Sequence, residues 1–346
     1  MLADAWPLAV LAILLAWPVP TVLARAVWPR RHPRAAIALW QAVGVAGGLS
    51  LIGAPLAIGV APLDGHLRTG LAELARDAVR LRVPEALGWG QEVALALAGV
   101  LAVRLVGVTL LSAVRIERDL RRQRYAVDLA AEHADRQVRV LEHAAPAAYC
   151  LPGTRPRIVI TEGTIAALAP DELEAVLAHE RAHARWRHEL VVQPFVAWES
   201  ALPLPPARRA TAAVTALVEM LADDHAARAV SRPALARALV AIGGTAGVVP
   251  TRRGTGGGGT AADEKASTPT LDRVHRLIRA TTAATATSST ATATAATGKT
   301  TARATAATAT GRRTTPTATT TERLIAPAAW LTATLLLIAP TWFVLR

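Results

Sequence analysis

Residues 179–183, HERAH, contain two histidines and a glutamate at a spacing that suits metal binding and general-base catalysis. His179 and His183 are four positions apart, so on a helix both imidazoles project from one face and can bind a single tetrahedral metal ion. Glu180 lies on the adjoining edge, within reach of a water molecule at that metal. The H-E-x-x-H pattern is typical of zinc peptidases, in which the glutamate is the general base.

A third metal ligand is expected from a later helix, because a catalytic zinc takes three protein ligands and keeps one position for water. The best candidate is Glu219, in LVEMLADDHAAR. Asp223 follows it on the same helical face, where it could accept the second ring N–H of a ligand histidine. The weaker candidates for the third ligand are Glu199, Asp224 and His225.

The other polar residues of the motif helix are predicted to face solvent. His188 and Glu189 fall off the metal-facing side, and Arg181, Arg185 and Arg187 are expected to be surface charges. The alternative for the whole stretch is an ordinary polar helix without a metal, with the later acidic pair at the edge of a helix bundle.

The hydropathy of the chain predicts four transmembrane helices around this site. Hydrophobic residues make up 52% of the sequence and aromatic residues only 4%, so the apolar content is mainly aliphatic. Each of four apolar stretches reaches the roughly 20 residues that a helix needs to cross the hydrocarbon of a bilayer. The stretches are residues 5–24, 36–60, 93–114 and 324–345.

Arg104 is the one charged residue inside these stretches. A charge within a span is a functional-site hypothesis by default, and here it suggests a signal relay. A snorkelling side chain or a contact within the helix bundle is an equally good interpretation.

The charge distribution predicts the orientation in the membrane. The formal net charge is +12, and arginines cluster in residues 25–34 and 115–124, whereas residues 61–90 carry both signs. The positive-inside rule therefore places residues 115–323 in the cytoplasm and the N-terminus outside. We expect a multi-pass protein of a bacterial-type plasma membrane. Because topology explains the arginines, and no aromatic residues are interleaved with them, direct nucleic-acid binding is not expected.

The fold class expected is mainly α, a polytopic membrane protein with a helical peptidase domain that contains a small β element. Within that domain we predict a charged helix, a Pro-Gly turn followed by a short strand, and three further helices. They are residues 115–145, 151–161, 170–190, 206–229 and 271–280. The predicted organisation is a three-span membrane region, a cytoplasmic peptidase domain, a disordered Thr/Ala-rich linker and a fourth transmembrane helix. These parts are residues 1–114, 115–280, 281–323 and 324–346.

Residues 243–265 are rich in glycine and are predicted to form a flexible loop. The single cysteine, Cys150, excludes an intrachain disulfide and a CxxC metal site, and we expect it to be a small buried residue.

Two segments resemble the membrane zinc metallopeptidases of the BlaR/MecR type, which are antibiotic-sensing signal transducers. They are PRIVITEGTIAALAPDELEAVLAHERAHARWRHEL and EMLADDHAAR. The resemblance covers residues 150–230 closely, and the order of three spans, peptidase domain and fourth span extends it to the rest. The motif pair is also similar to the zinc peptidases of the CAAX-protease and HtpX type, which share the Glu-x-x-x-Asp helix.

The resemblance implies a zincin-like (gluzincin) fold and a role for each of five residues. It implies zinc ligands at His179, His183 and Glu219, a general base at Glu180 and a supporting hydrogen-bond acceptor at Asp223. In the antibiotic sensors a penicillin-binding domain follows the last span, and the sequence up to Arg346 has no counterpart of it. We therefore expect a separate sensor partner, or a signal received by residues 61–90 or by the spans.

Together these features predict a membrane zinc endopeptidase with one zinc ion per chain. The expected substrate is a polypeptide, either a transcriptional repressor or a membrane-associated protein, cleaved in regulatory proteolysis and signal transduction. Two alternatives stay open. One is a housekeeping protease that clears membrane proteins, and the other is a non-catalytic membrane adaptor. Glu180 argues against the adaptor, because a purely structural metal site does not need a base.

Overall fold

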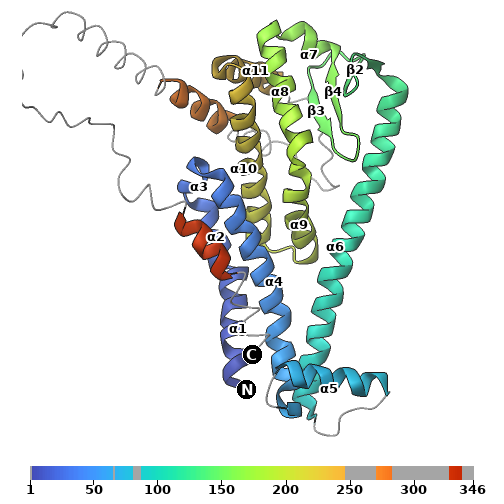
Figure 1. Ribbon diagram of the computed structural model, residues 1–346, viewed down its shortest axis with the longest axis vertical. Coiled ribbons are helices and arrows are strands. Elements are labelled where there is room, and N and C mark those ends of the chain that lie inside the picture. Colours follow the sequence, from blue (N-terminus) through green and yellow to red (C-terminus); the bar gives the residue numbers. More distant parts are fainter. Residues whose placement is uncertain (1, 65–66, 81–86, 246–269, 283–326, 337–346) are drawn as a thin grey trace, which may run out of the picture. The chain divides into compact units, whose positions relative to one another are not determined.

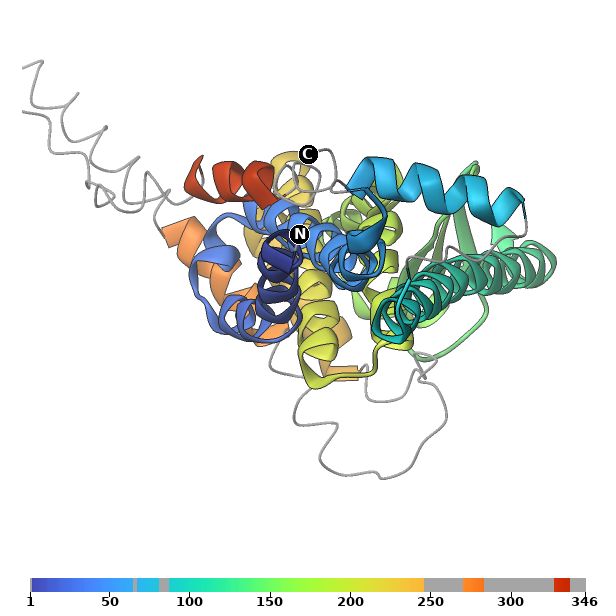
Figure 2. The ribbon, with the colours of Figure 1, turned by 90° about the horizontal axis from the view of Figure 1, so that it is seen from below.

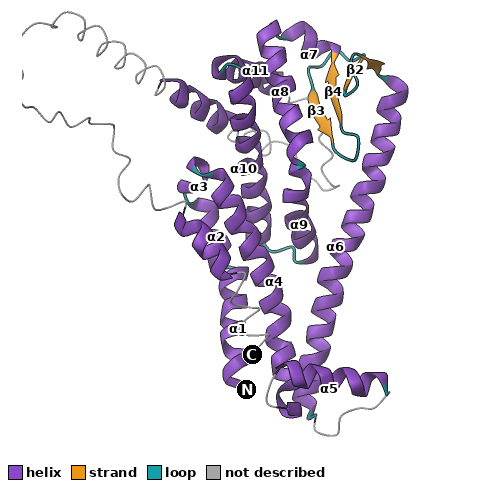
Figure 3. Cartoon of the chain, in the orientation of Figure 1, coloured by secondary structure: helices purple, strands orange, loops and turns teal. Residues whose placement is uncertain are grey.

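The computed structural model describes residues 2–64, 67–80, 87–245, 270–282 and 327–336 (Figure 1). These residues are mainly helical, and the strands are confined to residues 132–161 (Figure 3). The chain divides into two compact units, which are described separately below. The first comprises Met1–Asp119, His188–Glu219 and Thr319–Arg346, and the second comprises Leu120–Arg187 and Met220–Ala318.

The first unit contains the apolar helices that the hydropathy predicts. Its N-terminal helices are α1 (Leu2–Ala16), α2 (Pro18–Arg25), α3 (Trp28–Arg31), α4 (Pro33–Asp64), α5 (Leu67–Val79) and the first part of α6 (Trp89–Ala130). Among the described residues, three segments are long and apolar enough to cross a membrane: Trp6–Arg25, Pro33–Leu63 and Trp89–Ala130. Three of the four predicted spans thus have the length and composition expected. Of the fourth, only Pro327–Leu336 lies within the described residues, as a shorter apolar helix.

Helix α1 packs along α4 in an antiparallel arrangement (Figures 1 and 2). Leu8 lies in one apolar cluster with Ala54 and Val60, and Leu15 lies in another with Val43 and Ala46. The predicted first span is two helices rather than one, because the chain breaks at Trp17 and α2 begins with a proline. A proline lacks the N–H that would continue the hydrogen bonding of α1.

The helices α9 (His188–Ala201) and α10 (Pro205–Ala229) also contribute to the first unit, through residues 188–219. Phe195 of α9 and Val214 of α10 are buried in a cluster with Trp40 of α4. The rings of Trp40 and Phe195 meet edge to face, with centroids 6.3 Å apart. A segment predicted as part of the peptidase domain therefore packs against the apolar helices.

Replacing Gly47 of α4 by valine is expected to destabilise the first unit by about 1–3 kcal/mol, because added atoms in a packed core displace their neighbours. A Cβ at Gly47 would lie 3.2 Å from Cη2 of Trp198 and 3.4 Å from Cβ of Leu15. The matched control is Gly99→Val in α6, where a Cβ meets nothing within 4 Å. Thermal unfolding of both variants in detergent measures the difference, and equal midpoints would contradict this packing.

The second unit contains a four-stranded sheet of β1 (Glu132–His133), β2 (Val138–Leu141), β3 (Ala148–Leu151) and β4 (Arg157–Thr161). The strand order is β1-β2-β4-β3, in which β2 and β4 are parallel and the other pairs antiparallel. Buried Ile158, Val159 and Ile160 make β4 the apolar centre of this sheet. The Pro-Gly turn and the short strand predicted within residues 151–161 correspond to the turn at Gly153, where φ is +146°, and to β4.

The predicted helix 115–145 is wrong beyond Ala130, where α6 ends and the strands β1 and β2 follow. Val138 and Val140 pair with Ile158 and Ile160 of β4. This pairing joins residues about twenty positions apart, so tertiary contacts override the helical character of the charged sequence.

The remaining helices of the second unit are α7 (Glu162–Ala167), α8 (Pro170–Trp186), the rest of α10, α11 (Arg232–Thr245) and a helix of residues 270–282. The predicted helices 206–229 and 271–280 correspond to α10 and to residues 270–282. Helix α11 was not predicted. Most of the predicted Gly-rich loop 243–265 and of the linker 281–323 lies outside the described residues.

Candidate metal centre

Helix α8 positions the two histidines of the HERAH motif. Its first turn is fixed by Arg237 of α11, which pairs with Asp171 at 2.7 Å and with Glu172 at 2.8 Å. The buried residues Ala175, Val176 and Ala182 give α8 an apolar side. His179 is buried along the same helix and His183 is half-buried.

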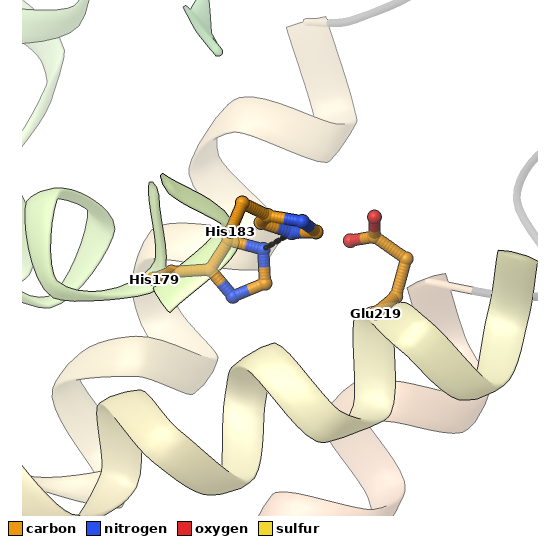
Figure 4. Close-up of side chains that lie close together, drawn as sticks. All are labelled: His179, His183 and Glu219. Carbon is orange, nitrogen blue, oxygen red and sulfur yellow. Dashed lines mark hydrogen bonds between the residues drawn. The ribbon is translucent and has the colours of Figure 1, made fainter. Parts of the chain in front are cut away.

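Three side chains form a group that could bind a metal ion: His179, His183 and Glu219 (Figure 4). One ligand atom from each lies within 4.8 Å of the others. The Nε2 atoms of the two histidines are 3.1 Å apart. Two nitrogens bound to a tetrahedral zinc at about 2.0–2.1 Å are separated by roughly 3.3 Å, so this spacing fits a shared zinc ion.

Glu219 comes from α10, near the point where the chain passes from the first unit to the second. The helix continues without a break from Glu219 to Asp223, which fixes the two acids one turn apart on one face. Two imidazole nitrogens and one carboxylate oxygen are a donor set found in catalytic zinc sites with three protein ligands. The residues present therefore fit zinc.

Asp223 supports this group through His179. Its Oδ1 lies 3.0 Å from Nδ1 of His179, and the Asp223 side chain is 1% exposed. With the carboxylate 3.0 Å away, the proton of the neutral ring is favoured on Nδ1, which leaves the Nε2 lone pair available for a metal. The sequence predicted Asp223 as such an acceptor, and the structure places it at hydrogen-bonding distance.

The charge of Asp223 is balanced by Arg273, from the helix of residues 270–282. The guanidinium donates two hydrogen bonds to the carboxylate, from Nε at 2.8 Å and from Nη2 at 2.7 Å. Burial by itself would raise the pKa of Asp223, but Arg273 and His179 together hold this pKa well below its usual range. Asp223 is therefore an anion whose two oxygens are both engaged.

A second arginine of the same helix also holds α10. Arg276 donates to Asp224 at 2.7 Å and to the carbonyl of Met220 at 3.2 Å. Neither Arg273 nor Arg276 was predicted from the sequence as part of the site. The available signal was their spacing of three in LDRVHRLIRA, which puts them on one helical face opposite the adjacent acids of LADDHAAR.

The weaker candidates for the third ligand do not join the metal-capable group in the described part of the chain. Asp224 pairs with Arg276, and His225 packs its ring against Trp186 with centroids 4.9 Å apart. Glu199 lies on α9, half-buried. Glu180, the expected base, is also half-buried and follows His179 on α8.

The expectation that His188 faces solvent is wrong, because its side chain is buried, 3% exposed. The predicted helix 170–190 ends at Trp186, since Arg187 adopts a left-handed conformation with φ 49°. Helix α9 starts at His188, after this break, so the helical periodicity of α8 cannot be extended to this residue. Glu189 is half-buried, and Arg181, Arg185 and Arg187 are exposed as expected.

Comparison with known proteins agrees with this chemistry. Residues 112–281 match the sequence profile of Peptidase family M48, and the match supports a zinc metallopeptidase. The matched segment includes both histidines of the HERAH motif, Glu219, Asp223 and Arg273. No curated protein and no solved structure matches the chain.

Proposed function

We propose that this protein is a membrane-embedded, zinc-dependent endopeptidase that acts on polypeptides in regulatory proteolysis. The observation that carries the proposal is the convergence of His179, His183 and Glu219 on one small volume. The 3.0 Å contact between Nδ1 of His179 and the buried carboxylate of Asp223 adds the support that zinc-binding histidines usually have. The M48 match and the three long apolar helices support the membrane peptidase class.

In this proposal His179, His183 and Glu219 hold one zinc ion per chain. Bound zinc would supply Lewis acidity, which polarises the scissile carbonyl and makes an attacking water more acidic. Glu180 accepts the proton of that water and passes it to the leaving amine. Asp223 keeps the His179 ring in one tautomer and one orientation throughout the reaction.

The regulatory role rests on the resemblance to the BlaR/MecR type. We propose that the metal centre lies on the cytoplasmic side, and the arginines of residues 25–34 and 115–124 support this orientation through the positive-inside rule. A substrate in this compartment is a transcriptional repressor or a membrane-associated protein. The signal is supplied by a separate sensor partner, by residues 61–90 or by the spans.

Removal of the metal tests the proposal in the full chain, reconstituted in lipid vesicles. We expect a zinc chelator to abolish hydrolysis of an unfolded reporter polypeptide, and stoichiometric zinc to restore it. Hydrolysis that persists in excess chelator, with zinc shown to be absent, would contradict a zinc mechanism. Full zinc occupancy with no hydrolysis of any polypeptide in a broad reporter set would favour the membrane adaptor.

A further inference from the structure

Helix α9 runs beside the membrane helix α4 in the same direction, and three successive contacts show it. Nε2 of Gln41 donates to the carbonyl of Val191 at 2.8 Å. One turn further, the Phe195 ring meets Trp40 and lies 3.9 Å from the position of a Cβ on Gly44. The Trp198 ring then lies against Gly47 and Gly48. The contacts advance together along both helices, and small residues on α4 allow the close approach.

Helix α9 ends against the middle of another apolar helix. Nε of Arg104 in α6 donates to the carbonyl of Ala201, the last residue of α9, at 2.8 Å. The last carbonyls of a helix have no partner within the helix and carry partial negative charge, so an arginine there is a favourable cap. Arg104 is also the one charge within the apolar residues 93–114. A charge and an orphan carbonyl, each unfavourable alone in hydrocarbon, satisfy each other here.

We propose that residues 188–219 form a hairpin inserted into the bilayer to about mid-depth, and that this hairpin fixes the metal ligand Glu219 at the membrane surface. The contact that carries the inference is the cap of α9 by Arg104. It lies near the middle of residues 93–114, and Gly47 and Gly48 lie near the middle of residues 36–60. Two spans thus place the end of α9 at a similar depth.

The depth of Glu219 follows from the return helix α10. The Thr211 hydroxyl donates to the carbonyl of Phe195 at 3.2 Å, so Thr211 lies level with Phe195 and with Gly44. Gly44 is about one helical turn from the middle of residues 36–60, or about 6 Å at 1.5 Å per residue. Glu219 is about two turns beyond Thr211, a further 12 Å or so. Glu219 then lies about 18 Å from the bilayer centre, just outside a hydrocarbon half-thickness of about 15 Å.

The hairpin carries three charged residues near its tip, Glu199 at the end of α9 and two arginines on α10, and the arginines limit how it can insert. Arg208 and Arg209 are exposed on the first turns of α10. Long arginine side chains at this depth extend toward the nearer interface, and local thinning of the bilayer with water drawn in from that side solvates the guanidinium. A hairpin that enters from one side allows this, whereas insertion through both leaflets would not.

This placement specifies the substrate class of the proposed peptidase, and to that extent it rests on the proposed function. With Glu219 held at the membrane surface, a scissile bond must approach within a few ångströms of the hydrocarbon boundary. The substrates expected are unfolded segments directly next to a transmembrane helix or lipid anchor. A freely diffusing polypeptide would reach the site less often.

Spin labels report the depth of the hairpin without any need for activity. In a Cys150→Ser background in lipid vesicles, a label is attached at Ser200, an exposed residue of α9 near the tip. Labels at Val103 of α6 and at Arg136, both exposed, are the hydrocarbon and aqueous references. We expect the Ser200 label to match Val103, accessible to oxygen and shielded from a water-soluble nickel complex. A Ser200 label as accessible to nickel as Arg136 would overturn the insertion.

A second measurement tests the substrate class with one reporter sequence fused at increasing distances from a transmembrane helix. We expect cleavage to fall severalfold as the reporter moves from the membrane surface to a distance of several turns. Equal cleavage at all distances would overturn this part of the inference. If the Ser200 label lies in the hydrocarbon but no reporter is cleaved, the proposed peptidase function is contradicted and the hairpin insertion is not. If reporters are cleaved in the presence of zinc but the Ser200 label is exposed to water, the hairpin insertion is contradicted and the proposed peptidase function is not.

Discussion

Replacing Glu180 by glutamine is expected to lower peptide hydrolysis by a factor of about 10²–10⁴, the usual contribution of a general acid–base group. Glutamine keeps the size of the side chain but cannot accept the proton of the attacking water. The proposed metal ligands are unchanged, so zinc binding should stay at the wild-type level. Turnover of a reporter polypeptide and zinc content, measured on the same preparation, check both parts of this expectation.

The matched control for Glu180→Gln is Glu174→Gln. Glu174 is an exposed glutamate on the same helix, about a turn and a half before the motif. This variant should retain wild-type turnover, because it loses the same charge without touching the metal group. Unchanged hydrolysis in Glu180→Gln would contradict the role of Glu180 as general base. An equal loss in both variants would point to a general effect on α8.

The second large effect is expected from Arg273→Met, which should weaken zinc binding by about 10–100-fold. The substitution leaves the carboxylate of Asp223 buried without its bidentate partner, a change of about 3–5 kcal/mol in folding free energy for a broken buried ion pair. His179 then loses a fixed acceptor for its ring proton. Competition with a chromogenic zinc chelator measures the affinity, and thermal unfolding in detergent measures the stability.

Arg276→Met provides the comparison for this prediction. Arg276 lies on the same helix and pairs with Asp224, a partner that is half-exposed rather than buried. Its loss should change zinc affinity little, because a solvent-accessible ion pair contributes only about 0–1 kcal/mol. Equal losses of affinity in the two variants would mean that the helix 270–282 acts as a packing element. The support of Asp223 would then not be specific to Arg273.

The parts of the site that depend on local spacing could be predicted from the sequence. His179 and His183 share one face of α8 because four residues are close to one helical turn, and the same holds for Glu219 and Asp223 on α10. Arg273 could not be predicted, because its partner lies about fifty residues earlier in the chain. Nothing in the spacing along one helix specifies such a contact.

The errors in the predicted fold also arise largely from contacts between residues that are distant in the sequence. The predicted helix 115–145 fails where β2 pairs with β4, a contact between distant segments. His188 was misplaced because a single left-handed residue, Arg187, ends the periodicity of α8. Hydropathy did not predict the α9–α10 hairpin as a membrane segment, because α9 is shorter than a full span and contains Glu199. Arg104 appeared as an isolated charge because the carbonyl it caps, in Ala201, lies in a distant helix.

The most direct test of the central claim is the zinc content per chain of detergent-purified protein. The wild type is compared with Glu219→Ala, with Glu180→Gln and with Glu199→Ala as a control acid on α9. We predict close to one zinc ion in the wild type, in Glu180→Gln and in Glu199→Ala, and a large loss in Glu219→Ala. A wild-type protein without zinc under metal-replete conditions, or full zinc in Glu219→Ala, would contradict the proposed three-ligand metal centre.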